Sequence, residues 1–232
     1  MAQVNRAFIE QFANSLGALS DSAKKTLVKQ LSTVDLDNYH DVAGVMRFVC
    51  MPYTDMSAAI TADFYNQIRK AAGAKGTYSA TAESGYDPDK VTAASYAIQK
   101  EVSEGRNTVP FVHLLEDVVD REIKNASDYC VRRNTRRDPA KPRYASVPTS
   151  SNPCAWCVMR ASQGFVYYDS KTVEHSHHAC KCIAVPGFDG YTEVEGYDPD
   201  KYYEMYAEAR DEVGTSEKSA VLSEMRKQQD IS

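Results

Sequence analysis

Four cysteines and a histidine in the last third of the chain have the types and spacing of metal ligands. Cys154 and Cys157 form a C-x-x-C pair, and the run His177-x-x-Cys180-x-Cys182 begins 20 positions later. Two cysteines at C-x-x-C spacing can place both thiolates on one small ion. A second group of Cys and His can then complete the tetrahedron that Zn²⁺ prefers. The sequence therefore predicts a structural zinc site.

The second half of this set offers more donors than a tetrahedral site needs. His175 and His178 lie beside the run, so seven groups compete for four positions. We expect the zinc ligands to be Cys154, Cys157, Cys180 and either His177 or Cys182.

Two other interpretations of these cysteines stay open, namely disulfide bonds and unligated thiols in a core. The first residues lead into an amphipathic stretch rather than a continuous apolar segment, so no secretory signal is visible. A reducing cytosol disfavours disulfides. Cys50 and Cys130 stand far from other cysteines in the sequence, which is typical of buried thiols. We therefore place the zinc site ahead of both alternatives.

A catalytic metal is a further possibility, because Pro153-Cys154-Ala155-Trp156-Cys157 matches the P-C-x-x-C half of the zinc deaminase signature. That chemistry also needs an H-x-E element, and the chain has none. A metallohydrolase would need an open metal position, whereas the surplus of donors favours a closed site. The standard hydrolase, nucleotide-binding and metalloprotease motifs are also absent. We expect no enzymatic activity.

A basic segment precedes the cysteines, while the end of the chain is acidic. Residues 132–143 carry six basic groups against one acidic group, and residues 183–232 carry 12 acidic against five basic. The segment suits either a strap that touches nucleic acid or an acidic protein groove, or a solvated linker between domains. The net charge of −5 argues against a general nucleic-acid binder. The candidate contact residues are Arg132, Arg133, Arg136, Arg137, Lys141 and Arg143.

Apolar residues recur at helical spacing through about the first 130 residues. Ser20 or Asp21 is expected to cap a second helix, Asp37 or Asn38 a third, and Pro52 is expected to end that third helix. A small, polar stretch from Gly73 to Gly85 predicts a loop. The expected helices begin near residues 4, 21, 38, 55, 87 and 108, and the last of them ends near 131.

Short β-structure is expected around the cysteines. Phe165–Tyr168 and Cys182–Val185 are predicted to form an antiparallel pair, and residues 154–162 a short helix. Two helices, about 198–213 and 216–228, close the chain. A six-residue sequence, GYDPDK, occurs at Gly85 and again at Gly196, and its Asp-Pro-Asp pattern predicts two helix starts.

These elements predict a predominantly helical α+β fold in 232 residues, of which 43% are apolar. The expected parts are a helical domain (1–131), a basic proline-containing linker (132–149), a small α+β zinc module (150–190) and acidic C-terminal helices (191–232). No apolar run approaches the roughly 20 residues needed to cross a bilayer, so we expect no membrane anchor.

The cysteine region resembles the MuF-like minor head proteins of tailed bacteriophages. The similarity covers Val147-Pro148-Thr149, the stretch from Cys154 to Tyr167, His177-x-x-Cys180-x-Cys182 and Val185-Pro186-Gly187-Phe188. The helical part resembles theirs around Ala62-Asp63-Phe64-Tyr65. By this likeness the matched cysteine-box positions are Cys154, Cys157, His177, Cys180 and Cys182.

The resemblance implies a minor structural protein of the phage head, made in the host cytoplasm and present in multiple copies per virion. Its expected partners are the major capsid protein, the portal protein or both, with a role in head morphogenesis or DNA delivery. Packaged DNA could be contacted through the basic segment. The alternative is a zinc-stapled protein that binds or processes nucleic acid, with Trp156, Tyr167 and Tyr168 as stacking surfaces.

Overall fold

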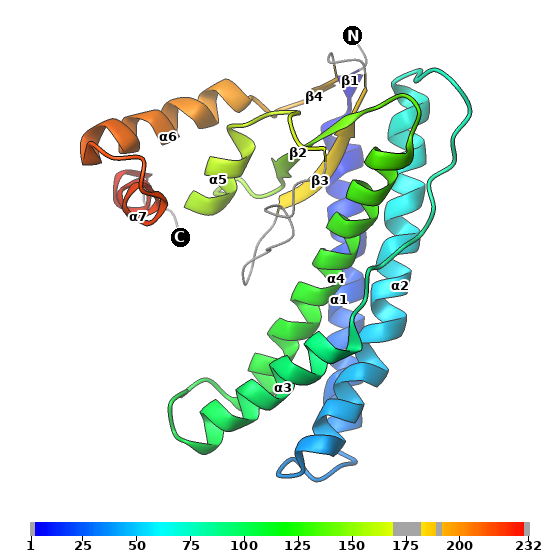
Figure 1. Cartoon of the computed structure of the whole chain (residues 1–232), viewed down its shortest axis with the longest axis vertical. Helices are drawn as coiled ribbons and strands as arrows, with labels where there is room; N and C mark the ends of the chain where they lie inside the picture. The colour runs from blue at the N-terminus through cyan, green and yellow to red at the C-terminus, as the bar shows by residue number, and fades with distance from the viewer. Residues whose placement is uncertain (1–2, 169–181, 189–191, 230–232) are drawn as a thin grey trace.

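The computed structural model describes residues 3–168, 182–188 and 192–229. An elongated bundle of long helices carries a smaller module that projects sideways from one end (Figure 1). The bundle helices are α1 (Arg6–Leu31), α2 (Tyr39–Ala71), α3 (Pro88–Ser103) and α4 (Phe111–Arg137), and the module helices are α5 (Ala155–Ala161), α6 (Pro199–Val213) and α7 (Lys218–Gln229). The strands are β1 (Gln3–Val4), β2 (Arg143–Pro148), β3 (Cys182–Gly187) and β4 (Glu193–Val194). The predicted helix-rich α+β fold is confirmed.

Helix α1 is continuous, and the expectation that a second helix begins at Ser20 or Asp21 is wrong. Asn5 caps α1, because its side chain accepts a hydrogen bond from the Ala7 amide at 2.7 Å. Ser20 lies in the middle of the helix and is buried. Its hydroxyl donates to the Asp120 carboxylate of α4 at 2.7 Å. Ser20 therefore joins α1 to α4 and does not cap a helix.

Helix α2 begins as predicted, with Asn38 as its cap, but it continues through Pro52. Proline removes one helical hydrogen bond and costs about 3 kcal/mol in a helix interior. Pro52 lies on the exposed side of α2, while Val49, Cys50 and Thr54 around it are buried. Burial along the opposite face outweighs the cost of the proline, so the expected helix end at Pro52 is wrong.

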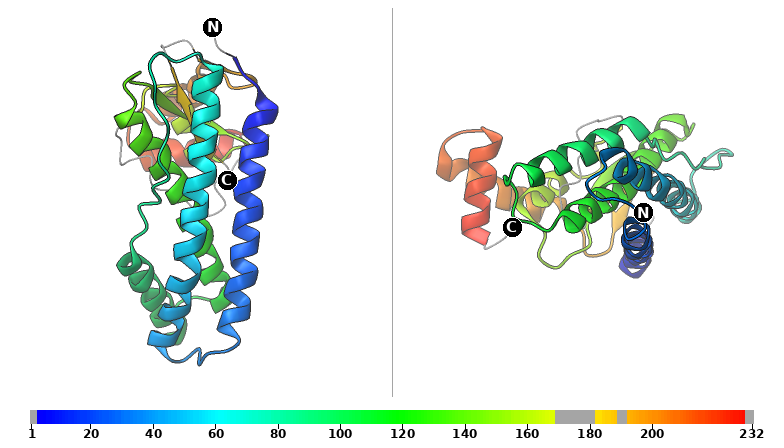
Figure 2. Two further views of the ribbon diagram at one scale, coloured as in Figure 1. Left: turned by 90° about the vertical axis from the view of Figure 1, so that its right-hand side faces the viewer. Right: turned by 90° about the horizontal axis from the view of Figure 1, so that it is seen from below.

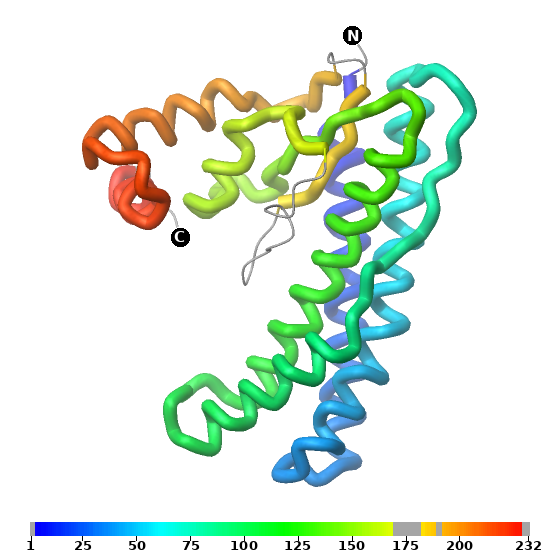
Figure 3. The backbone as a smooth tube through the Cα atoms, viewed as in Figure 1, coloured from blue at the N-terminus to red at the C-terminus, as the bar shows by residue number. Residues whose placement is uncertain are grey.

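The core at the end of the bundle away from the module joins all four long helices. Leu27, Met46, Val91 and Leu115, one from each helix, are fully buried there. Between α2 and α3 the chain runs back along the bundle as an extended segment, which the backbone trace makes visible (Figure 3). The predicted loop from Gly73 to Gly85 is confirmed.

A second core cluster joins the bundle to the module. Phe12 of α1 stacks on Phe64 of α2, with ring centroids 3.9 Å apart. Val147 of β2 and Val185 of β3 are buried in the same cluster, as is Tyr197 before α6. The cluster contains residues from all four of the predicted parts of the chain. The division into four parts stays a prediction.

The segment 132–149 differs from the extended linker that its prolines and charges predict. Helix α4 runs on to Arg137, a short turn follows, and β2 pairs antiparallel with β3 from Arg143 opposite Gly187 to Pro148 opposite Cys182. The helix continues because Val131, Asn134 and Thr135 keep its buried face.

The predicted pairing of Phe165–Tyr168 with β3 is wrong. Only an isolated bridge joins Tyr167 to Tyr144 there.

The remaining strands tie the start of the described chain to the start of α6. β1 and β4 pair in parallel, with Gln3 opposite Glu193 and Val4 opposite Val194. Both GYDPDK copies begin helices as predicted, with Asp87 and Asp198 as caps. Figure 2 shows α6 and α7 standing well to the side of the bundle. No helix of the described residues is long and apolar enough to cross a membrane.

Candidate functional site

Two of the predicted metal ligands lie together at the start of α5. Cys154 is the residue before the helix, and its sulfur accepts a hydrogen bond from the Cys157 amide at 3.4 Å. Cys157 is buried, whereas Cys154 is half-buried. The C-x-x-C spacing therefore places both thiols on one helical turn, as the sequence predicts.

Cys182 is the first residue of strand β3. It lies opposite Pro148 in the sheet, and Cys154 follows Pro148 by six positions. Burial raises the pKa of the Tyr202 hydroxyl, and the thiols of Cys182 and Cys157 act in the same direction. Both thiols thus lie within electrostatic range of one tyrosine.

The other predicted ligands, His177 and Cys180, lie outside the described residues, as do His175 and His178. Among residues 3–168, 182–188 and 192–229, no group of three or more His, Cys, Asp or Glu side chains could hold a metal ion. The three described thiols are a donor set of the soft type that Zn²⁺ accepts, but they do not form a complete site alone. The zinc site stays a prediction.

The two cysteines outside this box are buried in the bundle. Burial raises the pKa of Cys50 to about 12 and that of Cys130 to about 11. A thiol that stays protonated is a poor nucleophile and a poor metal ligand. These two residues therefore belong to the core, as their isolated positions in the sequence predict.

Three of the six predicted basic contact residues make contacts within the protein. Arg132 is buried, with its guanidinium 5.0 Å from the ring centre of Tyr129. Arg137 pairs with Glu83, and Arg133 Nε lies 3.4 Å from the same carboxylate. The hydrogen bond from Arg137 holds the pKa of Glu83 below its usual range. Arg133 and Arg137 therefore fasten α4 to the extended segment before α3, whereas the contact of Arg132 with Tyr129 stays within α4.

The other three basic residues are exposed at the end of the bundle where the module begins. They are Arg136, Lys141 and Arg143. The Arg143 guanidinium lies 4.8 Å from the ring centre of Tyr168, whose hydroxyl donates to the Arg136 carbonyl at 3.5 Å. Tyr168 therefore connects two of the exposed arginines.

The predicted stacking aromatics do not share one surface. Trp156 of α5 lies beneath Lys218 of α7, with the ammonium 4.3 Å from the ring centre. Tyr167 packs against Tyr144, with ring centroids 5.6 Å apart. Only Tyr168 lies beside the exposed arginines.

Sequence reasoning missed a groove between α1 and α4. It has a volume of about 760 Å³ and reaches Cys182 and Ile183 of β3. Burial acts to raise the pKa of Asp120 in its wall, but hydrogen bonds from Lys124 and Ser20 outweigh burial and lower it. Spacing could not reveal the groove because its wall comes from four separate segments. Its charged residues are Glu10, Asp21, Asp120, Lys124 and Asp128.

Comparison with known protein families identifies the family of this chain. Residues 3–209 match the family model described as VG15 protein, a span that includes the whole bundle, both sheets and most of α6. The chain belongs to the VG15 protein family. Membership places it among viral gene products of the phage type. No curated protein and no solved structure gave a significant match to this VG15 family member.

Proposed function

We propose that this VG15 family protein is a minor structural component of a tailed-phage head. It associates with the capsid, the portal or both, and takes part in head morphogenesis or DNA delivery without catalysing a reaction. The observation that carries the proposal is the family match over residues 3–209. The likeness of the cysteine region to MuF-like minor head proteins supplies the finer assignment to the head.

The shape and charge of the molecule support an assembly role. Helix α2 alone has 33 residues, about 50 Å at 1.5 Å per residue. The module projects from one end of this rod, so the chain offers two arms to neighbouring subunits (Figure 1). Helix α6 of one arm carries five acidic side chains against two basic ones, which favours a basic protein surface as partner.

A structural zinc ion fits the proposed role. The residues that would hold it are Cys154, Cys157 and Cys180, with either His177 or Cys182 as the fourth ligand. A closed site supplies stability and no reaction chemistry. In this chain it would fasten the start of α5 to the chain segment that leads into β3.

A second candidate function is contact with nucleic acid at the basic end of the bundle. The observation that favours it is the placement of the Tyr168 ring beneath the Arg143 guanidinium and beside Arg136. Aromatic rings and guanidinium groups are the usual stacking partners of unpaired bases, and exposed cations neutralise phosphates. A head protein with such a surface would touch packaged DNA, whereas a separate nucleic-acid-binding protein would use it without entering the particle.

The experiment that tests the proposal is quantitative mass spectrometry of phage particles purified from cells that carry the encoding phage or prophage. Full and empty heads are separated by density, and cross-links to capsid and portal subunits are mapped. We expect the protein in both fractions, cross-linked to the portal or capsid. Absence from particles, together with salt-sensitive retention of the free protein on DNA, would contradict the head assignment and favour the second candidate.

A further inference from the structure

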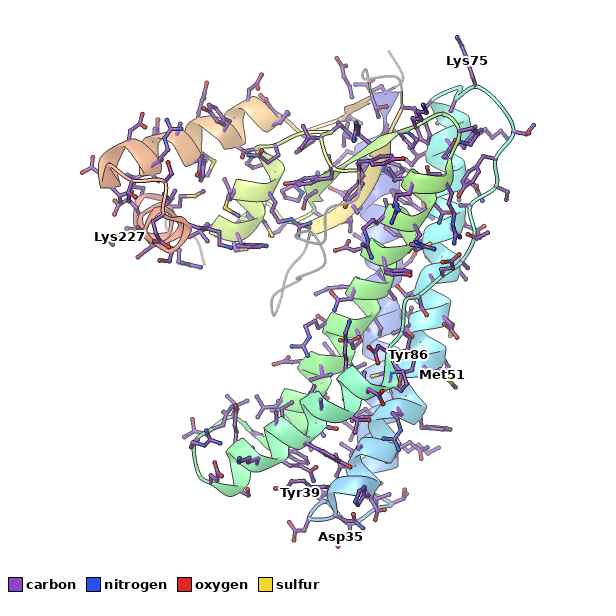
Figure 4. All side chains as sticks on the ribbon, viewed as in Figure 1. Asp35, Tyr39, Met51, Lys75, Tyr86 and Lys227 are labelled. Atoms are coloured by element: carbon purple, nitrogen blue, oxygen red, sulfur yellow. The ribbon has the colours of Figure 1, made fainter. Side chains whose placement is uncertain are left out.

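An apolar stripe runs along the outer face of α2 and lacks a covering element in the described part of the chain. Phe48, Met51 and Met56 are 61%, 54% and 50% exposed. Pro52 and Ala59 are exposed in the same stripe. In the left view of Figure 2, α2 lines this side of the bundle along its length, and Met51 points away from the bundle in Figure 4. Side chains of this size usually mark a contact surface when they adjoin one another.

Two charged residues border the stripe along the same edge, one before its centre in the sequence and one after it. Arg47 and Asp55 lie four positions before and after Met51 on one side of the helix face. Arg47 Nη1 donates to Thr92 at 2.9 Å, and Asp55 accepts from Ser84 at 2.7 Å. Both side chains are therefore held on the side of α2 that faces the segment leading into α3.

We propose that this face of α2 pairs with the same face of a second copy of the chain. A two-fold axis perpendicular to α2 brings each residue before the centre opposite the residue equally far beyond the centre in the partner. With the axis at Met51, Arg47 comes opposite the partner's Asp55, and Met51 comes opposite the partner's Met51. On the other side of the stripe, Phe48 lies three positions before this axis and Met56 five positions beyond it.

The residues of the stripe also match the geometry of helix packing. Gly44, Phe48, Pro52 and Met56 form one row at four-residue spacing, and Arg47, Met51, Asp55 and Ala59 form the other. Rows of this spacing pack into each other at a crossing angle of about 50°. The small residues Gly44 and Ala59 end the two rows. A crossing angle of this size separates the helix ends, so the like charges of Asp41 and Asp63 stay apart.

The area of one helix face limits the strength of the pair. A single helix crossing buries less than the roughly 800 Å² per partner of a standard stable interface. We therefore expect a reversible dimer with a dissociation constant in the micromolar range, which would matter most where a virion holds many copies close together.

The test is sedimentation velocity of the full chain over a concentration series up to about 100 μM. The wild-type chain is expected to shift from monomer to dimer. Arg47→Glu and Asp55→Arg each place like charges in contact, and each is expected to weaken the dimer about tenfold or more. The double variant Arg47→Glu/Asp55→Arg restores opposite charges and is expected to return to within about threefold of wild type.

Two further variants separate dimerisation from folding. Phe48→Ser is expected to weaken the dimer with an unchanged circular dichroism spectrum, because its side chain is exposed. Lys25→Glu changes an exposed charge on α1 and is expected to leave dimerisation unchanged. A wild-type chain that stays monomeric at about 100 μM, or a double variant as weak as the single ones, would overturn the proposal.

Discussion

Arg69 of α2 and Asp138 at the end of α4 form a buried ion pair, with Arg69 Nε 2.8 Å from Asp138 Oδ2. Asp138 also accepts a hydrogen bond from the Tyr65 hydroxyl at 3.2 Å. Arg69 Nη2 donates to the carbonyls of Lys75 and Gly76 at 2.8 and 3.0 Å. One pair of side chains therefore holds two helix ends and the start of the extended segment together.

Removing Arg69 should leave a buried carboxylate without its cation. We expect Arg69→Met to lower the free energy of unfolding by about 3–5 kcal/mol, measured by urea denaturation. Lys25→Met, which removes an exposed charge from α1, is the matched control and should change it by less than about 0.5 kcal/mol. A loss below about 1 kcal/mol in Arg69→Met would show that the pair contributes little.

Glu83 should make the stability of the bundle depend on acid. The hydrogen bond and charge of Arg137, aided by Arg133, lower the folded-state pKa of Glu83 from 4.5. A carboxyl with a depressed pKa adds stability above its unfolded pKa and loses it as the pH falls through the folded value. Wild type should therefore exceed Glu83→Gln in urea midpoint near neutral pH, and the difference should disappear well below pH 4.5. A difference that persists in acid would contradict this assignment.

The zinc prediction is tested by metal content and by a double variant. About one zinc per chain is expected from inductively coupled plasma mass spectrometry of protein purified under reducing conditions. Cys154→Ser/Cys157→Ser should lose the metal and melt the module while the bundle keeps its helical signal in circular dichroism. Cys50→Ser, a change at a buried thiol of the bundle, is the control that should retain the metal. If the double variant unfolded at the same temperature as wild type, the prediction that a zinc site stabilises the module would be wrong.

The exposed arginines and lysine should determine any affinity for DNA. Replacing Arg136, Arg143 and Lys141 together by Ser removes three phosphate-neutralising charges. The slope of log affinity against log salt concentration should fall by about 2–3 in fluorescence anisotropy titrations. A variant with Lys25 and Lys29 changed to Ser, on the exposed side of α1, should keep the wild-type slope. Equal slopes for both variants would exclude this surface as the contact.

The helices could be predicted from the sequence because their signals are local. Asn38 and Asp87 cap helices at the expected positions, and the apolar spacing of α4 marks its buried face. The sequence failed at Pro52 for the opposite reason. A proline predicts a helix end on local grounds, but tertiary burial of the residues around it decides the outcome.

Contacts between distant segments were beyond reach of the sequence. Local patterns pair β3 with residues 165–168, whereas its partner is β2, which the prolines and charges of the sequence place in a linker. The candidate site shows the same limit. Spacing alone joins Cys154 to Cys157, but the position of Cys182 opposite Pro148 depends on the β2–β3 register, which no local pattern encodes.

The pairing of β1 with β4 has a consequence for biosynthesis. Val4 leaves the ribosome before its partner Val194, which follows only after the bundle and most of the module have been made. Closing so long a loop is slow, and it cannot begin during translation of the bundle. Strand β1, just before α1, therefore stays unpaired until β4 has been synthesised. A bulky fusion placed before Gln3 should interfere with this final step of maturation more than with formation of the bundle.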